Sequence, residues 1–167
     1  MTDLFIGSIL KLRKTKTLSL SEKHQIFDLW NNEYPRNLKY ENFEQFKDYL
    51  KDLKDQNHIL VLDENERIIG WYFDFIREEE RWFAAILNSE FHGKKIGTSL
   101  MEMAKKERSK LNGWVITSND YLKSNNNVYN SPVGFYVKNG FQIHEDIRLE
   151  TGKINALKIS WEKNIQK

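Results

Sequence analysis

The chain has 167 residues, of which 40% are hydrophobic and 13% aromatic, so it can build one domain with a packed core. Its 26 Lys and Arg nearly balance 24 Asp and Glu, and the net charge of +2 argues against a broad electrostatic surface for nucleic acid. Cysteine is absent, which excludes disulfides, thiolate metal ligands and a cysteine nucleophile. The four histidines have no metal-ligand spacing, so we expect no metal and a single domain over residues 1–167.

The N-terminal region does not have the pattern of a secretory signal peptide. Its short apolar run, residues 4–10, precedes the basic residues 11–14, whereas a signal peptide carries its positive charges first. No apolar run reaches the length of a transmembrane helix. We therefore expect a soluble, cytoplasmic protein without membrane or nucleic-acid partners.

The first half of the chain predicts one strand, two helices and a group of three strands. Alternating apolar and polar residues predict a strand over Phe5–Arg13. A serine cap, Ser19 or Ser21, begins a helix that ends before Pro35. Apolar residues at helical spacing predict a second helix over Glu41–Asp55. The next connections are too short for crossovers, so we expect an antiparallel meander of His58–Asp63, Ile68–Ile76 and Arg81–Leu87.

The second half predicts a crossover helix and a C-terminal hairpin. Apolar spacing indicates a helix over Ile96–Leu111, with Gly113 as its stop signal. A short buried strand, Trp114–Ile116, then runs parallel to the preceding strand through a right-handed crossover. After the Asn-rich loop Lys123–Asn130 come a short helix from Pro132 to Asn139-Gly140 and two strands, Phe141–Leu149 and Ile154–Trp161. The fold expected is α/β: a mixed, mostly antiparallel sheet of six to seven strands flanked by about four helices.

One turn has the form of an anion-binding site. The apolar strand Trp82–Leu87 leads into a turn rich in Gly and Lys, and the turn leads into the helix that begins at Ile96. Backbone N–H groups at a helix start are unpaired, and the helix dipole favours negative charge there. This pattern predicts a phosphate or pyrophosphate ligand, although an ordinary glycine-containing turn is the better explanation when the pattern is taken alone.

Two motifs and the element order resemble the GNAT superfamily of acetyl-CoA-dependent N-acetyltransferases over roughly residues 58–145. The segment His92–Gly97 resembles the family's Gln/Arg-x-x-Gly-x-Gly/Ala pyrophosphate loop. The segment Asn130–Phe141 resembles its Phe-Tyr-x-Lys-x-Gly-Phe segment closely. The resemblance implies an acyltransferase enzyme that moves the acetyl group of acetyl-CoA to an amine.

The first motif departs from the family pattern at two positions. His92 stands where Gln or Arg is usual, and Lys95 stands where the first glycine of the pair is usual. Lys95 places a side chain where backbone should approach phosphate closely. It could clash with the phosphate, or it could turn outward and add a charge-assisted contact.

The resemblance also assigns residues to the acyl donor. The strand end would pair its backbone with the amides of pantetheine, and the loop would hold the pyrophosphate. The residues implied as donor contacts are Ile86, Leu87, Asn88, His92, Gly93, Lys94, Lys95, Ile96, Gly97, Thr98, Asn130 and Lys138. Asn125, Asn126 and Asn127 are rivals to Asn130, and a turn-forming role explains most of this Asn run.

The catalytic groups are less defined. Tyr136 is the candidate general acid, because a phenol with a pKa of about 10 can pass its proton to a departing thiolate whose thiol has a pKa of about 8.5. Glu80 is the candidate general base, with Asp74 and Glu90 as alternatives, and all three fit a surface or loop role as well. Aromatic residues could line an acceptor pocket or equally form core: Trp71, Tyr72, Phe73 and Trp82, covered by Trp30, Tyr34 and Tyr40.

The mechanism expected is direct attack of the acceptor amine in a ternary complex, since no cysteine can form an acyl-enzyme. The acceptor could be a small molecule or a protein amine, and the resemblance makes a homodimer through a sheet edge an option. The alternative is a non-catalytic acyl-CoA-binding or regulatory module on the same fold.

Overall fold

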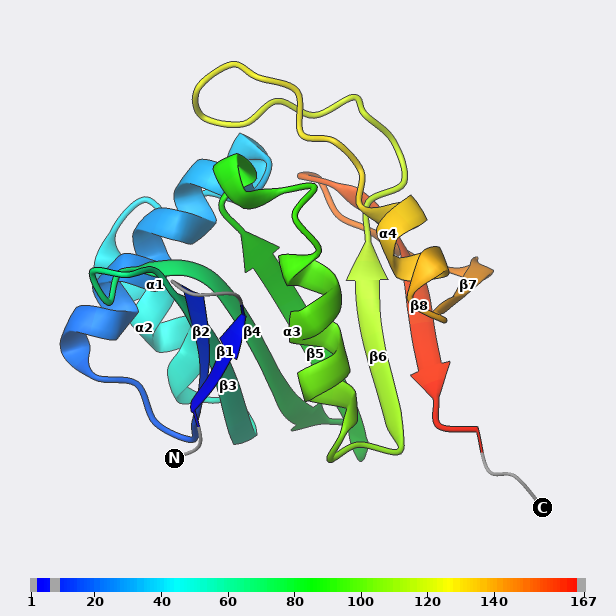
Figure 1. Cartoon of the computed structure of the whole chain (residues 1–167). Coiled ribbons are helices and arrows are strands. Elements are labelled where there is room, and N and C mark those ends of the chain that lie inside the picture. Colours follow the sequence, from blue (N-terminus) through cyan, green and yellow to red (C-terminus); the bar gives the residue numbers. More distant parts are fainter. Residues whose placement is uncertain (1–2, 7–9, 165–167) are drawn as a thin grey trace.

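A computed structural model describes residues 3–6 and 10–164 as a central sheet between two helical layers (Figure 1). The strands are β1 Asp3–Ile6, β2 Leu10–Thr15, β3 Lys54–Leu62, β4 Ile68–Arg77, β5 Glu80–Leu87, β6 Lys110–Val115, β7 Gln142–Glu150 and β8 Asn155–Glu162. The helices are α1 Leu20–Glu33, α2 Phe43–Lys51, α3 Ile96–Lys105 and α4 Val133–Lys138, with short 3-10 turns η1 Arg36–Leu38 and η2 Ser89–Phe91.

The sheet is mixed and mostly antiparallel, which confirms the expected fold class. The described strands lie in the order β1-β2-β3-β4-β5-β6-β8-β7, and β5–β6 is the parallel pair. The described sheet has eight strands because the segment predicted as one strand, Phe5–Arg13, contributes to two. β1 pairs antiparallel with β2, with Leu4 opposite Leu12. The meander of β3, β4 and β5 is antiparallel, as the short connections predict.

Side-chain alternation along the central strands divides the core into two layers. On β4, Trp71 and Phe73 face α1 and α2, whereas Tyr72 faces the α3 side. A capping box begins α1, since Ser19 Oγ accepts from Glu22 N–H at 3.1 Å and Glu22 Oε1 accepts from Ser19 N–H at 2.7 Å. Helices α3 and α4 cover the opposite face, so the motifs identified in the sequence lie together on one side of the sheet.

Helix α3 is shorter than the apolar spacing predicts. It ends at Lys105, and Leu111 and Gly113 lie inside β6. Leu111 is fully buried in the same core layer as the apolar face of α3. Leu111 therefore continues the apolar spacing of α3 by coincidence, because it faces the same layer from β6. Gly113 is not a helix stop, because it lies within β6. Packing favours glycine there, since a Cβ would lie 2.8 Å from Phe83 Cε1.

The parallel strands β5 and β6 separate toward their C-terminal ends (Figure 1). Their register contains one pair, Trp82 with Asn112, near the start of β5. Strand β5 stays paired with β4 along its whole length, from Arg77–Glu80 to Gly70–Leu87. The edge of β5 that faces β6 therefore pairs with no strand beyond Trp82, and we call the opening between the two separating strands the slot.

Replacing Gly113 tests its packing against Phe83, where β5 and β6 are still close together. We expect Gly113→Ala to lower the free energy of unfolding by about 1–3 kcal/mol, because the added methyl overlaps the Phe83 ring. Gly134→Ala in α4 is the matched control, since its Cβ would meet nothing within 4 Å and alanine favours helix. Urea unfolding of both variants measures the difference, and equal stabilities would contradict the packing argument.

Candidate functional site

The open edge of β5 presents the backbone of alternate residues to the slot. Asn88 N–H donates to Ile69 O at 2.8 Å, so Asn88 faces β4, and alternation turns Ile86 the same way. The backbone groups of Ala85 and Leu87 face the slot instead. Ile86, Leu87 and Asn88 were implied as donor contacts, and of these only Leu87 can pair its backbone with an amide in the slot. Ala85, which was not implied, can do the same.

The backbone carbonyls of Leu87 and Ala85, which face the slot, each have a side-chain partner. His92 Nε2 lies 2.8 Å from Leu87 O, so the imidazole fastens the loop to the end of β5. Tyr34 Oη lies 3.5 Å from Ala85 O, at the long limit of a hydrogen bond. The loop residue His92 is exposed, so this contact lies at the mouth of the slot.

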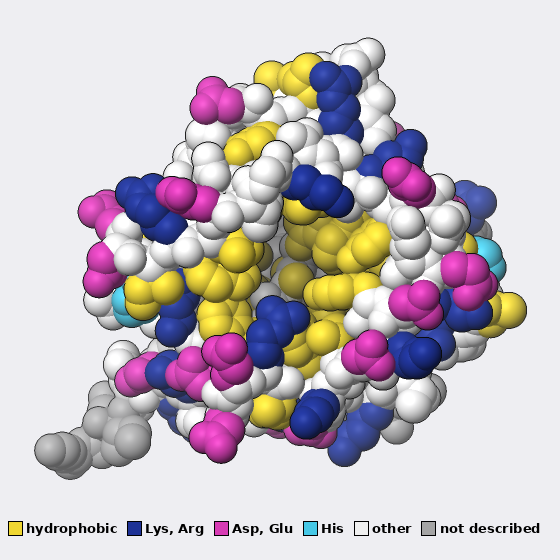
Figure 2. Space-filling view, turned by 180° about the vertical axis from the view of Figure 1, so that it is seen from behind, with side chains coloured by type: hydrophobic (Ala, Val, Ile, Leu, Met, Phe, Trp, Pro, Cys, Tyr) yellow, Lys and Arg dark blue, Asp and Glu magenta, His cyan; other side chains and the backbone are white. Residues whose placement is uncertain are grey.

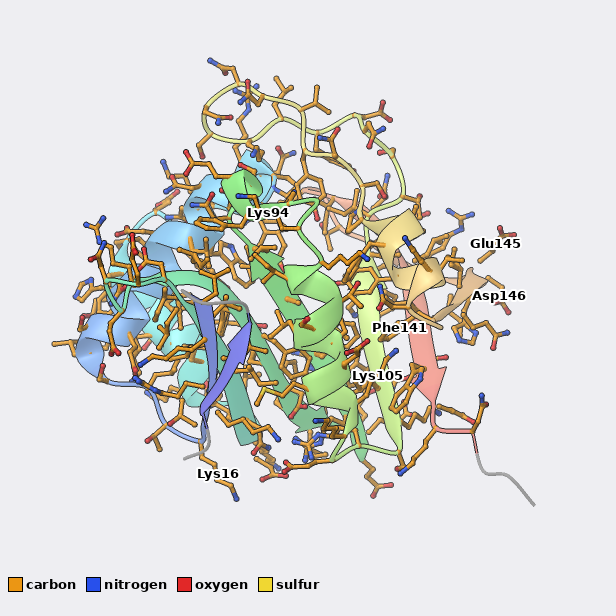
Figure 3. All side chains as sticks on the ribbon, in the orientation of Figure 1. Lys16, Lys94, Lys105, Phe141, Glu145 and Asp146 are labelled. Carbon is orange, nitrogen blue, oxygen red and sulfur yellow. The ribbon has the colours of Figure 1, made fainter. Side chains whose placement is uncertain are left out.

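The N-terminus of α3 opens at the same mouth. Lys95 is its N-cap and offers no side-chain hydrogen bond, while Ser99 N–H donates back to Lys95 O at 3.1 Å. The preceding N–H groups, of Ile96, Gly97 and Thr98, are the ones that a helix start leaves for a ligand. Figure 3 shows Lys94 beside this turn, at the opposite end of α3 from Lys105. The arrangement can bind a pyrophosphate through backbone amides and the helix dipole.

Backbone conformation favours glycine at positions 93 and 95 of the loop, whereas packing favours glycine at position 97. Gly93 has φ of +78°, and Lys95 takes the left-handed conformation with φ of +62°. Glycine is favoured there, which accounts for the glycine usual at the position of Lys95. Gly97 is required by packing, because a Cβ would lie 3.0 Å from Phe135 Cε1 on α4. Lys95 therefore carries backbone strain that glycine would not carry, and its side chain is exposed.

Lys95→Gly should therefore stabilise the protein. The left-handed conformation costs an L-residue about 1–2 kcal/mol, and the added chain entropy of glycine offsets part of that gain. We expect the free energy of unfolding to rise by about 0.5–1 kcal/mol in urea titrations. Lys94→Gly removes the same charge at a position with ordinary φ, so it should be neutral or destabilising. A loss of stability in Lys95→Gly would contradict this reading of the loop.

Tyr136 enters the slot region from α4. It is 7% exposed and packs against Phe83 and Phe141, with ring centroids 5.7 and 5.4 Å away. Burial raises the pKa of its phenol well above the ordinary value, so the group is neutral. Within residues 3–6 and 10–164, no protein group hydrogen-bonds this phenol, which leaves it free to contact a ligand.

Two further tyrosines approach from the other side of the sheet. Tyr34 follows α1 and Tyr129 lies in the loop before α4, with ring centroids 6.4 Å apart. Burial, and the nearby phenols of Tyr129 and Tyr136, raise the pKa of Tyr34. Burial raises the pKa of Tyr129 to about 12. Sequence reasoning placed Tyr34 only as a cover and missed Tyr129, although Tyr129 directly precedes the Asn130 motif.

The candidate bases do not join this group. Glu80 begins β5, seven residues from Leu87 and so about 23 Å along an extended strand. Its carboxylate pairs with Lys110 at 3.1 Å and Lys158 at 4.0 Å. Asp74 is 1% exposed and binds two arginines on the α3 side, so it is neither a surface carboxylate nor close to the loop. Glu90 is an exposed residue of η2.

The remaining predicted contacts lie around α4. Ser131 Oγ accepts from Val133 N–H at 3.3 Å, so Ser131 provides the hydrogen bond at the start of α4 and leaves exposed Asn130 beside it. Its rivals shape the loop: Asn125 Oδ1 accepts from Asn127 N–H, and Asn126 has φ of +70°. Lys138 is exposed on the last turn of α4, where it could reach a phosphate.

The chain belongs to the GNAT acetyltransferase family, because the family model described as acetyltransferase (GNAT) domain matches residues 55–143. It is an acyltransferase enzyme. No curated protein sequence matches it significantly. None of the helices in the described part of the chain is long and apolar enough to cross a membrane.

Solved structures share the fold at low identity. An aminoglycoside 6'-N-acetyltransferase complexed with coenzyme A has a TM-score of 0.68 and 13% identity, with 93% of this chain and 98% of that chain covered. A mutant of the spermidine N-acetyltransferase SpeG from Vibrio cholerae has a TM-score of 0.65 and 19% identity, with 92% and 93% covered. These likenesses establish the common fold.

Proposed function

We propose that this protein transfers the acetyl group of acetyl-CoA to an amine by direct attack in a ternary complex. The observation that carries the proposal is the slot between β5 and β6, which has the unpaired start of α3 at its mouth and the buried phenol of Tyr136 beside it. The coenzyme A in a structure of the same fold supports this choice of donor.

The residues at the slot fit the parts of the donor. The N–H groups of Ile96, Gly97 and Thr98 would hold the pyrophosphate, and the exposed Lys94 and Lys138 would add positive charge. The slot-facing backbone of Ala85 and Leu87 would pair with the pantetheine amides as a neighbouring strand would. Bound in this way, the donor would have its thioester beside Tyr136, Tyr34 and Tyr129.

Tyr136 would assist the departure of the thiolate. When the amine nitrogen attacks the thioester carbon and the C–S bond breaks, negative charge develops on sulfur. The neutral phenol donates a hydrogen bond, and then its proton, to that sulfur. Burial raises the pKa of the Tyr136 phenol, so the group stays protonated until negative charge develops on sulfur. The proton that the amine nitrogen loses leaves to water, and the Tyr136 phenolate takes a proton back from water.

Two measurements test the proposal. Acetyl-CoA should raise the midpoint of thermal unfolding, and a panel of primary amines should release free thiol detectable with a chromogenic disulfide. The panel should contain phenethylamine, spermidine, kanamycin and a peptide with a free N-terminus. Absence of any stabilisation at millimolar acetyl-CoA would sink the donor assignment. Stabilisation without thiol release from any amine would favour the non-catalytic acyl-CoA-binding module. The cytoplasmic location, the homodimer and the absence of a metal stay predictions.

A further inference from the structure

One lysine side chain joins the end of α3 to α4 and to β8. Lys105 is the last residue of α3, and in Figure 3 it lies next to Phe141, between α3 and α4. Its Nζ lies 5.3 Å from the centroid of the Phe141 ring and 5.1 Å from that of Trp161 on β8. The same Nζ donates a hydrogen bond to Asn139 O, at the C-cap of α4. A single ammonium therefore fastens three elements together.

The charge of Lys105 is used in these contacts and not in an ion pair. Among the residues that the structure describes, no carboxylate pairs with its ammonium. Burial lowers the pKa of the Lys105 amine, and the carboxylate of Glu102 on the same helix opposes that shift. Aromatic ring faces and the carbonyls at a helix end carry the partial negative charge that attracts a cation. Positive charge at this point therefore stabilises the junction between α3 and α4.

The two residues after α4 that Lys105 contacts, Asn139 and Phe141, both hold Tyr136. Asn139 N–H donates to Phe135 O and to Tyr136 O, at 3.1 Å each. Phe141 N–H donates to Tyr136 O at 3.0 Å, and the two rings lie edge to face with centroids 5.4 Å apart. Movement of either residue would therefore move Tyr136.

Helix α4 depends on such support, because it has only six residues and a helix of that length is not stable by itself. Tyr136 lies between the two attachments of this helix to α3. At one of them the Phe135 ring packs on Gly97, where a Cβ would lie 3.0 Å from Phe135 Cε1. At the other, Lys105 holds Asn139 O. Lys105 therefore supplies the polar one of the two attachments.

Lys105 is remote from the pyrophosphate loop and from the other face of the sheet. Ten residues of α3 separate it from the loop, or about 15 Å along the helix. Figure 2 shows the face that carries α1 and α2, which is hollowed at its centre with hydrophobic side chains around the hollow. Lys105 packs on Phe141, which belongs to the core layer of the opposite face. A substitution of Lys105 therefore changes neither the loop nor the hollow directly.

We propose that Lys105 is a positioning residue, whose ammonium fixes the end of α4 so that the Tyr136 hydroxyl meets the sulfur of the donor thioester. This inference rests on the function proposed above, and Lys105 acts only through Tyr136. Without the ammonium, Asn139 O bonds to water instead, and the rings of Phe141 and Trp161 lose the cation that they share. A misplacement of about 1 Å at the reacting groups can cost a factor of about 100 in rate.

Lys105→Met tests the inference, because methionine keeps an unbranched apolar side chain and removes the charge. The rate is measured as single-turnover thiol release from acetyl-CoA, with the primary amine of the panel that the wild type converts fastest. We expect this rate to fall by about 10- to 100-fold. The KM of acetyl-CoA and the dissociation constant of CoA, measured by calorimetry, should stay within about twofold of wild type.

Two further variants control for charge and for position. Lys105→Arg keeps a cation for the two rings and should hold the rate within about threefold of wild type. Lys106→Met removes the same charge from the next residue, which is exposed, and should behave as wild type. If Lys105→Met does not fold, Lys105→Gln replaces it, because glutamine removes the charge and keeps a neutral hydrogen-bond donor.

The Tyr136→Phe background shows whether Lys105 acts through the phenol. In that background Lys105→Met should lower the rate by less than about threefold, because the group that Lys105 positions is absent. A further loss as large as the one in the wild-type background would overturn the positioning role.

The remaining outcomes separate this inference from the function on which it rests. An unchanged rate in Lys105→Met overturns the role of Lys105 and leaves the proposed function standing. A loss of CoA affinity as large as the loss of rate, or a Lys105→Arg variant as slow as Lys105→Met, also overturns it, because both indicate a general structural defect. A wild-type rate in Tyr136→Phe removes the phenol as the acid, and this inference with it. Absence of thiol release from every amine by the wild type removes the proposed function itself.

Discussion

Tyr136→Phe should lower kcat by about 100- to 1000-fold with the affinity for CoA unchanged, since removal of a positioned general acid has effects in this range. The substitution keeps the aromatic ring and its packing on Phe83 and Phe141. It removes the hydroxyl, which no protein group in the described residues engages. Single-turnover thiol release and calorimetric titration with CoA measure the two quantities separately.

The same variant separates catalysis from folding. Because the lost hydroxyl has no protein hydrogen bond to break, the midpoint of thermal unfolding should stay close to that of wild type. A kcat within threefold of wild type would show that the thiolate departs without help from Tyr136. A matching loss of CoA affinity would instead assign the phenol to donor binding.

Asp74→Asn should lower the free energy of unfolding by about 3–5 kcal/mol, because it removes the charge that balances two guanidinium groups in a buried cluster. The carboxylate accepts from Tyr72 Oη at 2.5 Å, from Arg81 at 2.7 Å and from Arg108 at 2.9 and 3.0 Å. These contacts join β4, β5 and the chain just after α3. Urea unfolding at neutral pH measures the loss.

The matched control uses the second carboxylate on the same arginine. Asp55 also pairs with Arg81, but its side chain is 59% exposed. Asp55 has φ of +52°, a conformation that asparagine tolerates, so Asp55→Asn changes the charge without new backbone strain. We expect a change below about 1 kcal/mol, because solvent screens an exposed pair. Comparable losses in the two variants would show that burial is not what makes the Asp74 cluster important.

Most of the fold and one half of the site could be predicted from local sequence. The antiparallel meander followed from connections too short for a crossover, and the helix starts followed from caps such as Ser19. The pyrophosphate loop and Tyr136 could be proposed because both belong to contiguous motifs. The predicted end of α3 was wrong. Leu111 lies in β6 and faces the core layer that a longer α3 would also have faced.

The contact between Tyr34 and Tyr129 could not be predicted, because the two residues come from elements far apart in the chain. Tyr34 and Tyr129 meet only because the loop after β6 is tied across the end of α1. The candidate base Glu80 stays a prediction, and the structure places it at the start of β5, where it pairs with Lys110.

The sequence by itself determined which elements form, which family the motifs resemble, and that no cysteine can carry the acyl group, since these follow from residue types and short spacings. Tertiary structure alone decided that β5 and β6 separate, that Ala85 and Leu87 rather than Ile86 and Asn88 face the slot, and that Lys95 takes a strained left-handed backbone. The physical reason is that strand pairing, backbone dihedrals and the burial of charge depend on neighbours distant in sequence, which no local pattern records.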